Sequence, residues 1–80
     1  MANWFVYILK CKDKSLYTGI TNNIQKRLID HKAGKGSKYV RSRKAVRIVH
    51  SEKYSTKSKA LKREAEIKRL TRQQKLKLIK

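Results

Sequence analysis

The chain contains few acidic residues. Five Asp and Glu stand against 23 Lys and Arg, which gives the 80 residues a formal net charge of +18. Repulsion between so many like charges destabilises a compact state unless a polyanion offsets it. The charge therefore indicates nucleic acid as the leading partner. An anionic membrane surface, an RNA-associated or ribosomal role, and a solvated surface with no partner stay open as alternatives.

Cysteine is nearly absent, and proline is absent. Because Cys11 is the only cysteine, no disulfide can form within the chain, and a cysteine-rich zinc site lacks its ligands. Such a chain suits a reducing cytoplasm. The apolar stretch from Phe5 to Leu9 is far shorter than the roughly 20 residues that span a bilayer, and no export leader opens the chain. We therefore expect neither membrane insertion nor export.

The length allows a single small domain, 1–80, with one sheet and a few covering helices. Segments 4–11 and 16–21 are rich in aromatic and β-branched residues and flank a short polar stretch, which predicts a β-hairpin. Val46, Ile48 and Val49 predict a third strand that ends near Ser51. We expect the protein to be a monomer.

Helix signals follow the hairpin and the third strand. Asn22 or Asn23 can cap a first helix that ends at Gly34 and turns three apolar side chains inward, Ile24, Leu28 and Ile29. Ser55 or Thr56 can cap a long helix that runs to about Leu70. A last helix begins with the capping-box pair Thr71 and Gln74.

The segment 34–44 is strongly basic and contains Gly-Lys-Gly-Ser. A phosphate-binding P-loop needs its lysine after the second glycine of GxxxxGK[ST]; here the lysine precedes that glycine, so this motif is rejected. The composition instead predicts a basic loop within reach of phosphate. From this loop and the first helix we expect the nucleic-acid-binding side chains Lys26, Lys35, Lys38, Arg41, Arg43 and Lys44.

One carboxylate falls on the apolar side of the long helix. At about 100° per residue, Glu64 lies near the middle of a stripe formed by Ala60, Leu61, Ala65 and Ile67. An inward carboxylate is costly to bury without a cation, so Glu64 should meet a buried Arg or Lys or a bound divalent metal. The helical periodicity alone does not choose between a basic side chain and a metal. Glu66 falls on the basic side, as a surface partner of Lys62 or Arg69.

Two other pairs carry candidate chemistry. Arg27 and His31 are four residues apart on one edge of the first helix and could reach one phosphate, although a solvated basic edge is the commoner meaning of this spacing. Tyr7 and Tyr17 share a face of the hairpin if its loop has three residues. A strand tyrosine alone usually indicates core packing.

In order and spacing, these residues resemble the GIY-YIG nuclease family over nearly the whole chain. Its first motif is present as Phe5-Val6-Tyr7 and its second as Tyr17-Thr18-Gly19, so both tyrosines and the structural Gly19 match, while Phe5 replaces a glycine. The short form is also similar to small stand-alone bacterial members of unassigned function. An asparagine that some members carry late in the domain has no counterpart among Asn3, Asn22 and Asn23.

The resemblance implies an α+β fold, a three-stranded antiparallel sheet flanked by helices in the order β-β-α-β-α-α. It also implies a divalent-metal-dependent endonuclease that acts on DNA rather than RNA with little intrinsic sequence specificity, so that another protein would supply targeting. Glu64 would hold one Mg²⁺ or Mn²⁺. Tyr7, as general base, and Tyr17 would position the attacking water, Arg27 would stabilise phosphate charge, and His31 would orient the nucleophile or share proton transfer.

Two other classes of protein stay open. The first is a basic DNA- or RNA-binding accessory module that keeps the scaffold but is catalytically weak or inactive. The second binds an anionic membrane or an acidic protein through the Lys-rich C-terminal helices. Metal-dependent cutting separates the nuclease from both, and binding to lipid vesicles but not to DNA identifies the last.

Overall fold

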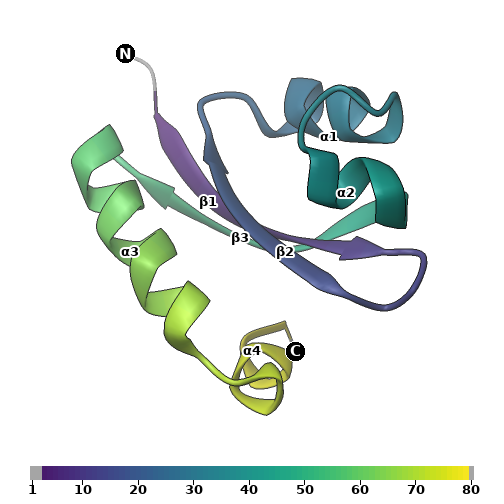
Figure 1. Cartoon of the computed structure of the whole chain (residues 1–80). Helices are drawn as coiled ribbons and strands as arrows, with labels where there is room; N and C mark the ends of the chain where they lie inside the picture. The colour runs from purple at the N-terminus through teal and green to yellow at the C-terminus, as the bar shows by residue number, and fades with distance from the viewer. Residues whose placement is uncertain (1–2, 80) are drawn as a thin grey trace.

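The protein is an α+β fold built on a three-stranded antiparallel sheet, as the sequence predicts (Figure 1). The computed structural model describes residues 3–79. Within these residues, no helix is long and apolar enough to cross a membrane. In chain order the elements are β1 (Trp4–Cys11), β2 (Leu16–Thr21), α1 (Ile24–Lys32), α2 (Lys38–Arg43), β3 (Ala45–Tyr54), α3 (Lys57–Arg69) and α4 (Arg72–Ile79).

The hairpin loop has three residues, which sets the register of β1 against β2. Cys11 N donates to Ser15 O at 2.9 Å and closes a loop over 12–14, in which Lys14 takes a positive φ of 71°. A left-handed residue at this place is usual in three-residue hairpin loops. Tyr7 consequently lies opposite Gly19, and Tyr17 lies opposite Leu9. Tyr7 and Tyr17 therefore share a face of the sheet.

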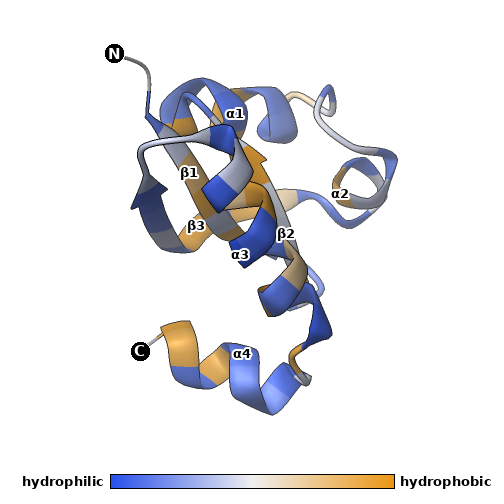
Figure 2. Cartoon of the chain, turned by 90° about the vertical axis from the view of Figure 1, so that its left-hand side faces the viewer, coloured by the Kyte–Doolittle hydropathy of each residue, from blue (hydrophilic) through white to orange (hydrophobic). Residues whose placement is uncertain are grey.

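The sheet order is β2-β1-β3, and the central strand β1 separates two apolar clusters. On one face, α1 and α2 cover a cluster whose buried members are Tyr7, Leu9, Cys11 and Val40. On the other face, α3 and α4 cover a cluster whose buried members are Val6, Ile8, Ala60 and Ile67. Figure 2 shows the apolar strands enclosed between largely hydrophilic helices.

The predicted caps are confirmed. Asn23 Oδ1 accepts from Lys26 N at 3.0 Å at the start of α1, and Gly34 takes a φ of +80° just beyond its end. Thr56 caps α3. At the start of α4, Thr71 N donates to Gln74 Oε1 and Gln74 N donates to Thr71 Oγ1, the reciprocal bonds of a capping box.

Two expectations about segments 24–44 are wrong. Ile29 is 66% exposed, because α1 contacts the sheet through Ile24 and Leu28 and a residue about 100° further round points away. The basic segment 34–44 is also not all loop, since it contains α2, which is held to the sheet by the fully buried Val40. The third strand extends to Tyr54, three residues past its predicted end near Ser51. The order of the strands and of the remaining helices along the chain is as predicted.

The partner predicted for Glu66 is also wrong. Its carboxylate pairs with Arg63 at 3.1 Å, three residues earlier, rather than with Lys62 or Arg69. Arg63 in turn binds Glu52 on β3, with Nε at 2.8 Å from Oε1. This guanidinium therefore joins α3 to the third strand.

Glu52 is the centre of a polar cluster between β3 and α3. Besides Arg63, it accepts from Tyr54 Oη at 2.6 Å and is bonded to His50 Nε2 at 2.8 Å. Burial alone would raise the pKa of this carboxyl, but the bonds from Arg63, His50 and Tyr54 outweigh burial and lower its pKa to about 2. The ionised form is thus the one that the fold stabilises.

We expect Glu52→Gln to destabilise the fold by about 2 kcal/mol at pH 7, because Arg63 loses its charged partner. A depressed carboxyl pKa stabilises the native state above the ordinary value of 4.5, and this contribution is lost as the pH falls towards about 2. Urea unfolding of parent and variant should therefore differ most at neutral pH and converge on acidification. Glu66→Gln, at an exposed carboxylate, is the control; an equal loss there would contradict the assignment.

Candidate active site

The hydroxyl of Tyr7 lies where two side chains of α1 meet β1. Tyr7 is 1% exposed, and its Oη lies 2.9 Å from His31 Nε2 and 3.4 Å from Arg27 Nε. Arg27 and His31 are one helical turn apart, and α1 packs against this face of the sheet, so both reach the same phenol. The shared edge predicted for the two residues is confirmed.

The hydrogen bonds of Tyr7 link its proton to the tautomer of His31. Arg27 can only donate, so the Tyr7 hydroxyl accepts from Arg27 Nε, and it donates its own proton to His31 Nε2 when the imidazole carries its proton on Nδ1. A neutral imidazole that accepts at Nε2 carries its proton on Nδ1, which is buried and has no hydrogen-bond partner among the described residues. In this tautomer the bond can pass a proton from the phenol to the imidazole.

Both groups are neutral near pH 7. Burial raises the pKa of Tyr7 above 10, and the hydrogen bond from Arg27 opposes this shift. Burial, followed by the positive charge of Arg27, lowers the pKa of His31 below 6.5, and Asp30 opposes that shift. The phenol thus needs help to ionise, and the neutral imidazole beside it has one ring nitrogen that can accept a proton.

Two glycines make room for these rings. A Cβ on Gly19 would lie 2.6 Å from Tyr7 Oη, so this position has no space for a larger residue. A Cβ on Gly36, in the α1–α2 connection, would overlap His31 Nδ1. Gly19 was singled out by its motif, whereas Gly36 was not, because sequence spacing does not reveal which loop glycine covers a histidine.

An aromatic row leads outward from the buried pair. The Tyr17 ring lies 6.3 Å from the Tyr7 ring, 5.5 Å from His31 and 5.9 Å from Tyr39, measured between centroids. Tyr39 is 40% exposed, and the Arg43 guanidinium lies 4.1 Å from its ring centre. Tyr17 therefore connects the buried phenol with the surface.

Glu64 belongs to the opposite helical layer, yet its charge acts on Tyr7. The carboxylate contributes to the raised pKa of that phenol, although less than burial and less than Tyr17. Its side chain is 18% exposed and lies 3.3 Å from Lys68 Nζ. Lys68 is itself 56% exposed, so the expected buried cation is replaced by a solvated one. Exposed pairs at this spacing are weak, and Glu64 is available to another cation.

The apolar stripe around Glu64 is narrower than predicted. Ala60 and Ile67 are fully buried, but Leu61 is 44% exposed and Ala65 is exposed. The α3 helix contacts the sheet along one line, and residues about 100° to either side of it reach solvent. Glu64 therefore lies at the edge of the packed surface rather than within it.

The donor set suits only one kind of metal site. Residues 3–79 contain no group of three or more His, Cys, Asp and Glu side chains that could hold a metal ion. A site that the protein encloses with its own ligands is therefore not formed. Mg²⁺ and Mn²⁺ commonly keep several waters and bind through one or two carboxylates plus substrate phosphate, and Glu64 fits that mode.

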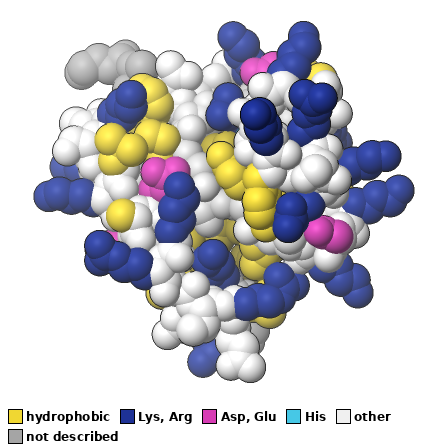
Figure 3. Space-filling view, viewed as in Figure 1, with side chains coloured by type: hydrophobic (Ala, Val, Ile, Leu, Met, Phe, Trp, Pro, Cys, Tyr) yellow, Lys and Arg dark blue, Asp and Glu magenta, His cyan; other side chains and the backbone are white. Residues whose placement is uncertain are grey.

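The predicted nucleic-acid-binding residues do not form one patch. Arg41 and Lys44 line a common hollow, whereas Arg43 is engaged with Asp13 at 3.3 Å and with the Tyr39 ring. Figure 3 shows Lys and Arg spread over both helical layers, with a strip of hydrophobic side chains between them. Lys38, at the start of α2, lines a second depression together with Arg41, whereas Lys26 and Lys35 are exposed at the start of α1 and in the α1–α2 connection.

Comparison with known proteins agrees with this geometry. The GIY-YIG catalytic domain matches residues 3–77, and the chain belongs to this family of nuclease domains. It is similar to the UPF0213 proteins of Staphylococcus haemolyticus, 56% identical over 99% of this chain and 96% of that protein, and Staphylococcus epidermidis, 57% identical with the same coverage. The solution NMR structure of a UPF0213 protein from Bacillus halodurans superimposes with a TM-score of 0.61 and 43% identity, covering 96% of this chain and 82% of that one.

Proposed function

We propose that this protein is a divalent-metal-dependent endonuclease that hydrolyses phosphodiester bonds in DNA with little intrinsic sequence specificity. The observation that carries the proposal is the meeting of Arg27 and His31 on the buried Tyr7 hydroxyl, within the field of Glu64. A cation, a phenol and a proton acceptor at one point are what an attack of water on a phosphate requires. If position 7 served only to pack the core, an apolar side chain without a hydroxyl would be sufficient.

We assign each side chain a role that is compatible with its position. Water loses a proton to Tyr7 Oη as its oxygen bonds to phosphorus, and the phenol proton passes to His31 Nε2, so that Tyr7 stays neutral. Arg27 holds positive charge beside the phosphate oxygens, where negative charge gathers as the leaving oxygen departs. Tyr17 positions the water beside Tyr7. A Mg²⁺ or Mn²⁺ held by Glu64 would supply Lewis-acid stabilisation of the phosphate.

Binding would come from phosphate contacts made by the surplus of Lys and Arg, and such binding weakens steeply with salt. Contacts to phosphate position a protein on DNA but do not read its sequence. We expect the protein to act as a monomer in the cytoplasm, with a separate protein supplying targeting.

The proposal is tested by incubating labelled duplex, single-stranded, flapped and branched DNA, and matched RNA, with the protein and Mg²⁺, Mn²⁺ or EDTA. Cutting that needs the metal and prefers DNA would support it. Binding to these substrates without any metal-dependent cutting would favour an accessory module on the same scaffold. Vesicle binding without DNA binding would favour the membrane alternative.

Arg27→Ala is expected to lower kcat by about 10²- to 10³-fold, because the donor to the transition-state charge is lost, while DNA affinity changes only slightly. Lys26→Ala is the matched control, since it removes the same charge from the preceding, exposed position. It should weaken binding without changing turnover. Single-turnover cleavage and binding in EDTA separate the two effects; an Arg27→Ala variant altered in affinity alone would remove the catalytic role.

A further inference from the structure

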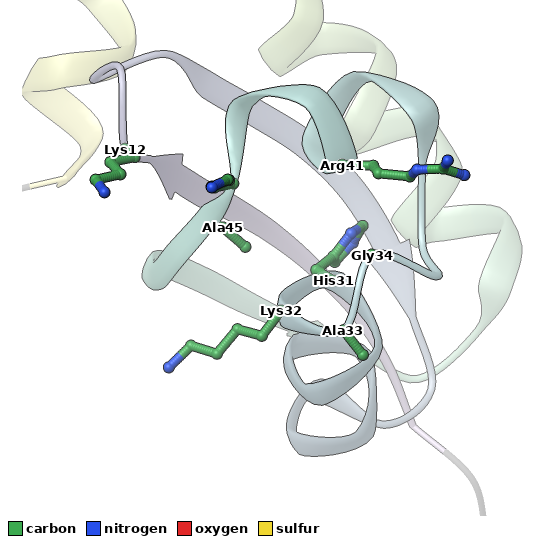
Figure 4. A pocket seen from close by; sticks show the side chains of 8 residues that line it. Lys12, His31, Lys32, Ala33, Gly34, Arg41 and Ala45 are labelled. Atoms are coloured by element: carbon green, nitrogen blue, oxygen red, sulfur yellow. The ribbon is translucent and has the colours of Figure 1, made fainter.

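A second basic feature lies next to His31. It is an open hollow of about 570 Å³, to which the β1–β2 loop, the end of α1, α2 and the α2–β3 junction all contribute. Its lining includes four cationic side chains, Lys12, Lys32, Arg41 and Lys44. Figure 4 shows that Lys12, Lys32 and Arg41 come from three separate elements, with Lys12 and Lys32 extending to one side of His31 and Arg41 to the other.

No acidic residue lines this hollow. Four of the five Asp and Glu side chains in the chain form ion pairs elsewhere. Asp13 pairs with Arg43, Glu52 and Glu66 both pair with Arg63, and Glu64 pairs with Lys68. The fifth, Asp30, lines a different depression beside Arg27. Four cationic residues thus line one hollow without a carboxylate beside them.

The backbone holds this arrangement in place at some cost. Lys44 ends α2 with a φ of 61° and a ψ of 112°, in the region that side-chain-bearing residues rarely adopt. Lys12 N donates to Lys44 O at 2.8 Å, which ties the hairpin loop to the α2–β3 junction. Glycine would relieve the strain at this position, yet a lysine occupies it. Strained residues that persist cluster at functional sites.

We propose that this hollow binds a backbone phosphate of the nucleic acid, distinct from the phosphate cleaved at Tyr7. Phosphate is the ligand class that suits a hollow lined by four cations and no carboxylate. His31 lines the hollow and also bonds Tyr7, so a strand at the candidate active site passes directly beside it. The inference rests on the proposed action on nucleic acid, and it assigns contacts to Lys12 and Lys32, which the sequence did not single out.

The test compares two double variants that each lose two positive charges. Lys12→Gln with Lys32→Gln alters the hollow, and Lys59→Gln with Lys77→Gln alters exposed positions on α3 and α4, in the opposite layer. Affinity for a duplex oligonucleotide is measured against salt in EDTA. We expect the hollow variant to reduce the slope of log K against log salt by about 1–2 and the control to change it far less. Equal slopes would overturn the proposal.

Two further measurements identify the ligand. In the parent, inorganic phosphate should shift amide resonances of residues 33, 34, 44 and 45, and the hollow variant should lose these shifts. Phosphate binding with unchanged DNA affinity would indicate a site for free phosphate and overturn the proposal.

The second measurement uses Lys44→Gly, which should raise Tm while weakening DNA binding. A rise in Tm with undiminished DNA binding would also count against the proposal. Because all readouts are made without metal, absence of cleavage by the parent would affect only the proposed reaction.

Discussion

Replacing Glu64 by glutamine is expected to abolish metal-dependent cleavage, with a loss of about 10³-fold or more in kcat. Glutamine keeps the shape of the side chain but removes the charge that would hold the metal. Affinity for DNA should stay the same or rise slightly, because a negative charge disappears from the protein. Cleavage under single turnover and binding in EDTA would show the two effects separately.

The matched control is Glu66→Gln, two residues further along α3. It removes the same charge from an exposed carboxylate and should leave cleavage unchanged. The fold should tolerate Glu64→Gln, since the lost pair with Lys68 is solvated, and an unchanged Tm would verify this. Equal residual cutting by parent and Glu64→Gln would identify a contaminating nuclease and remove the metal role from Glu64.

Tyr7→Phe is expected to lower kcat by about 10²- to 10⁴-fold, the usual effect of removing a group that transfers a proton. Phenylalanine fills the same buried space, so packing against Leu9 and Val40 is kept. DNA affinity should change little, because the substitution removes no charge from the protein. Tyr39→Phe provides the control for the loss of a phenol outside the proton path. A Tyr7→Phe enzyme as fast as the parent would exclude the phenol from the reaction.

The pH dependence of the parent gives a further readout of the Tyr7–His31 pair. A histidine with a lowered pKa stays neutral to a pH below 6.5, so the rate should hold down to that pH. Further acidification protonates Nε2, which can then no longer accept the phenol proton. The acid limb of the pH–rate profile should therefore lie below pH 6.5, and a limb above that value would contradict the proton path.

The sequence was sufficient to predict the pieces that depend on local rules. Loop length placed Tyr7 and Tyr17 on one face, because side chains alternate along a strand. Cap chemistry located the starts of α1, α3 and α4, because the residues that satisfy free backbone N–H groups lie within four positions of one another. The helical period likewise placed Arg27 and His31 together.

Tertiary contacts determined what sequence could not predict. The six residues of α2 are mostly polar, and so short a helix needs the buried Val40 to hold it against the sheet. The bond from Tyr7 to His31 and the contact of Gly36 with that ring join residues distant in the chain. Helical periodicity could not choose a cation for Glu64, because it gives the direction of a side chain but not its exposure, and the partner is the solvated Lys68 one turn further on.

The division of the candidate site between two layers links its integrity to the C-terminal part of the chain. Tyr7, Arg27 and His31 depend on the α1 side of the sheet, whereas Glu64 is carried by α3, which is anchored by Ala60, Ile67 and the Arg63–Glu52 pair. Local detachment of α3 would withdraw the carboxylate while the tyrosines stayed in place. Heat inactivation would then precede global unfolding, and the C-terminal third of the chain would act as a switch for the reaction without contacting the phenol.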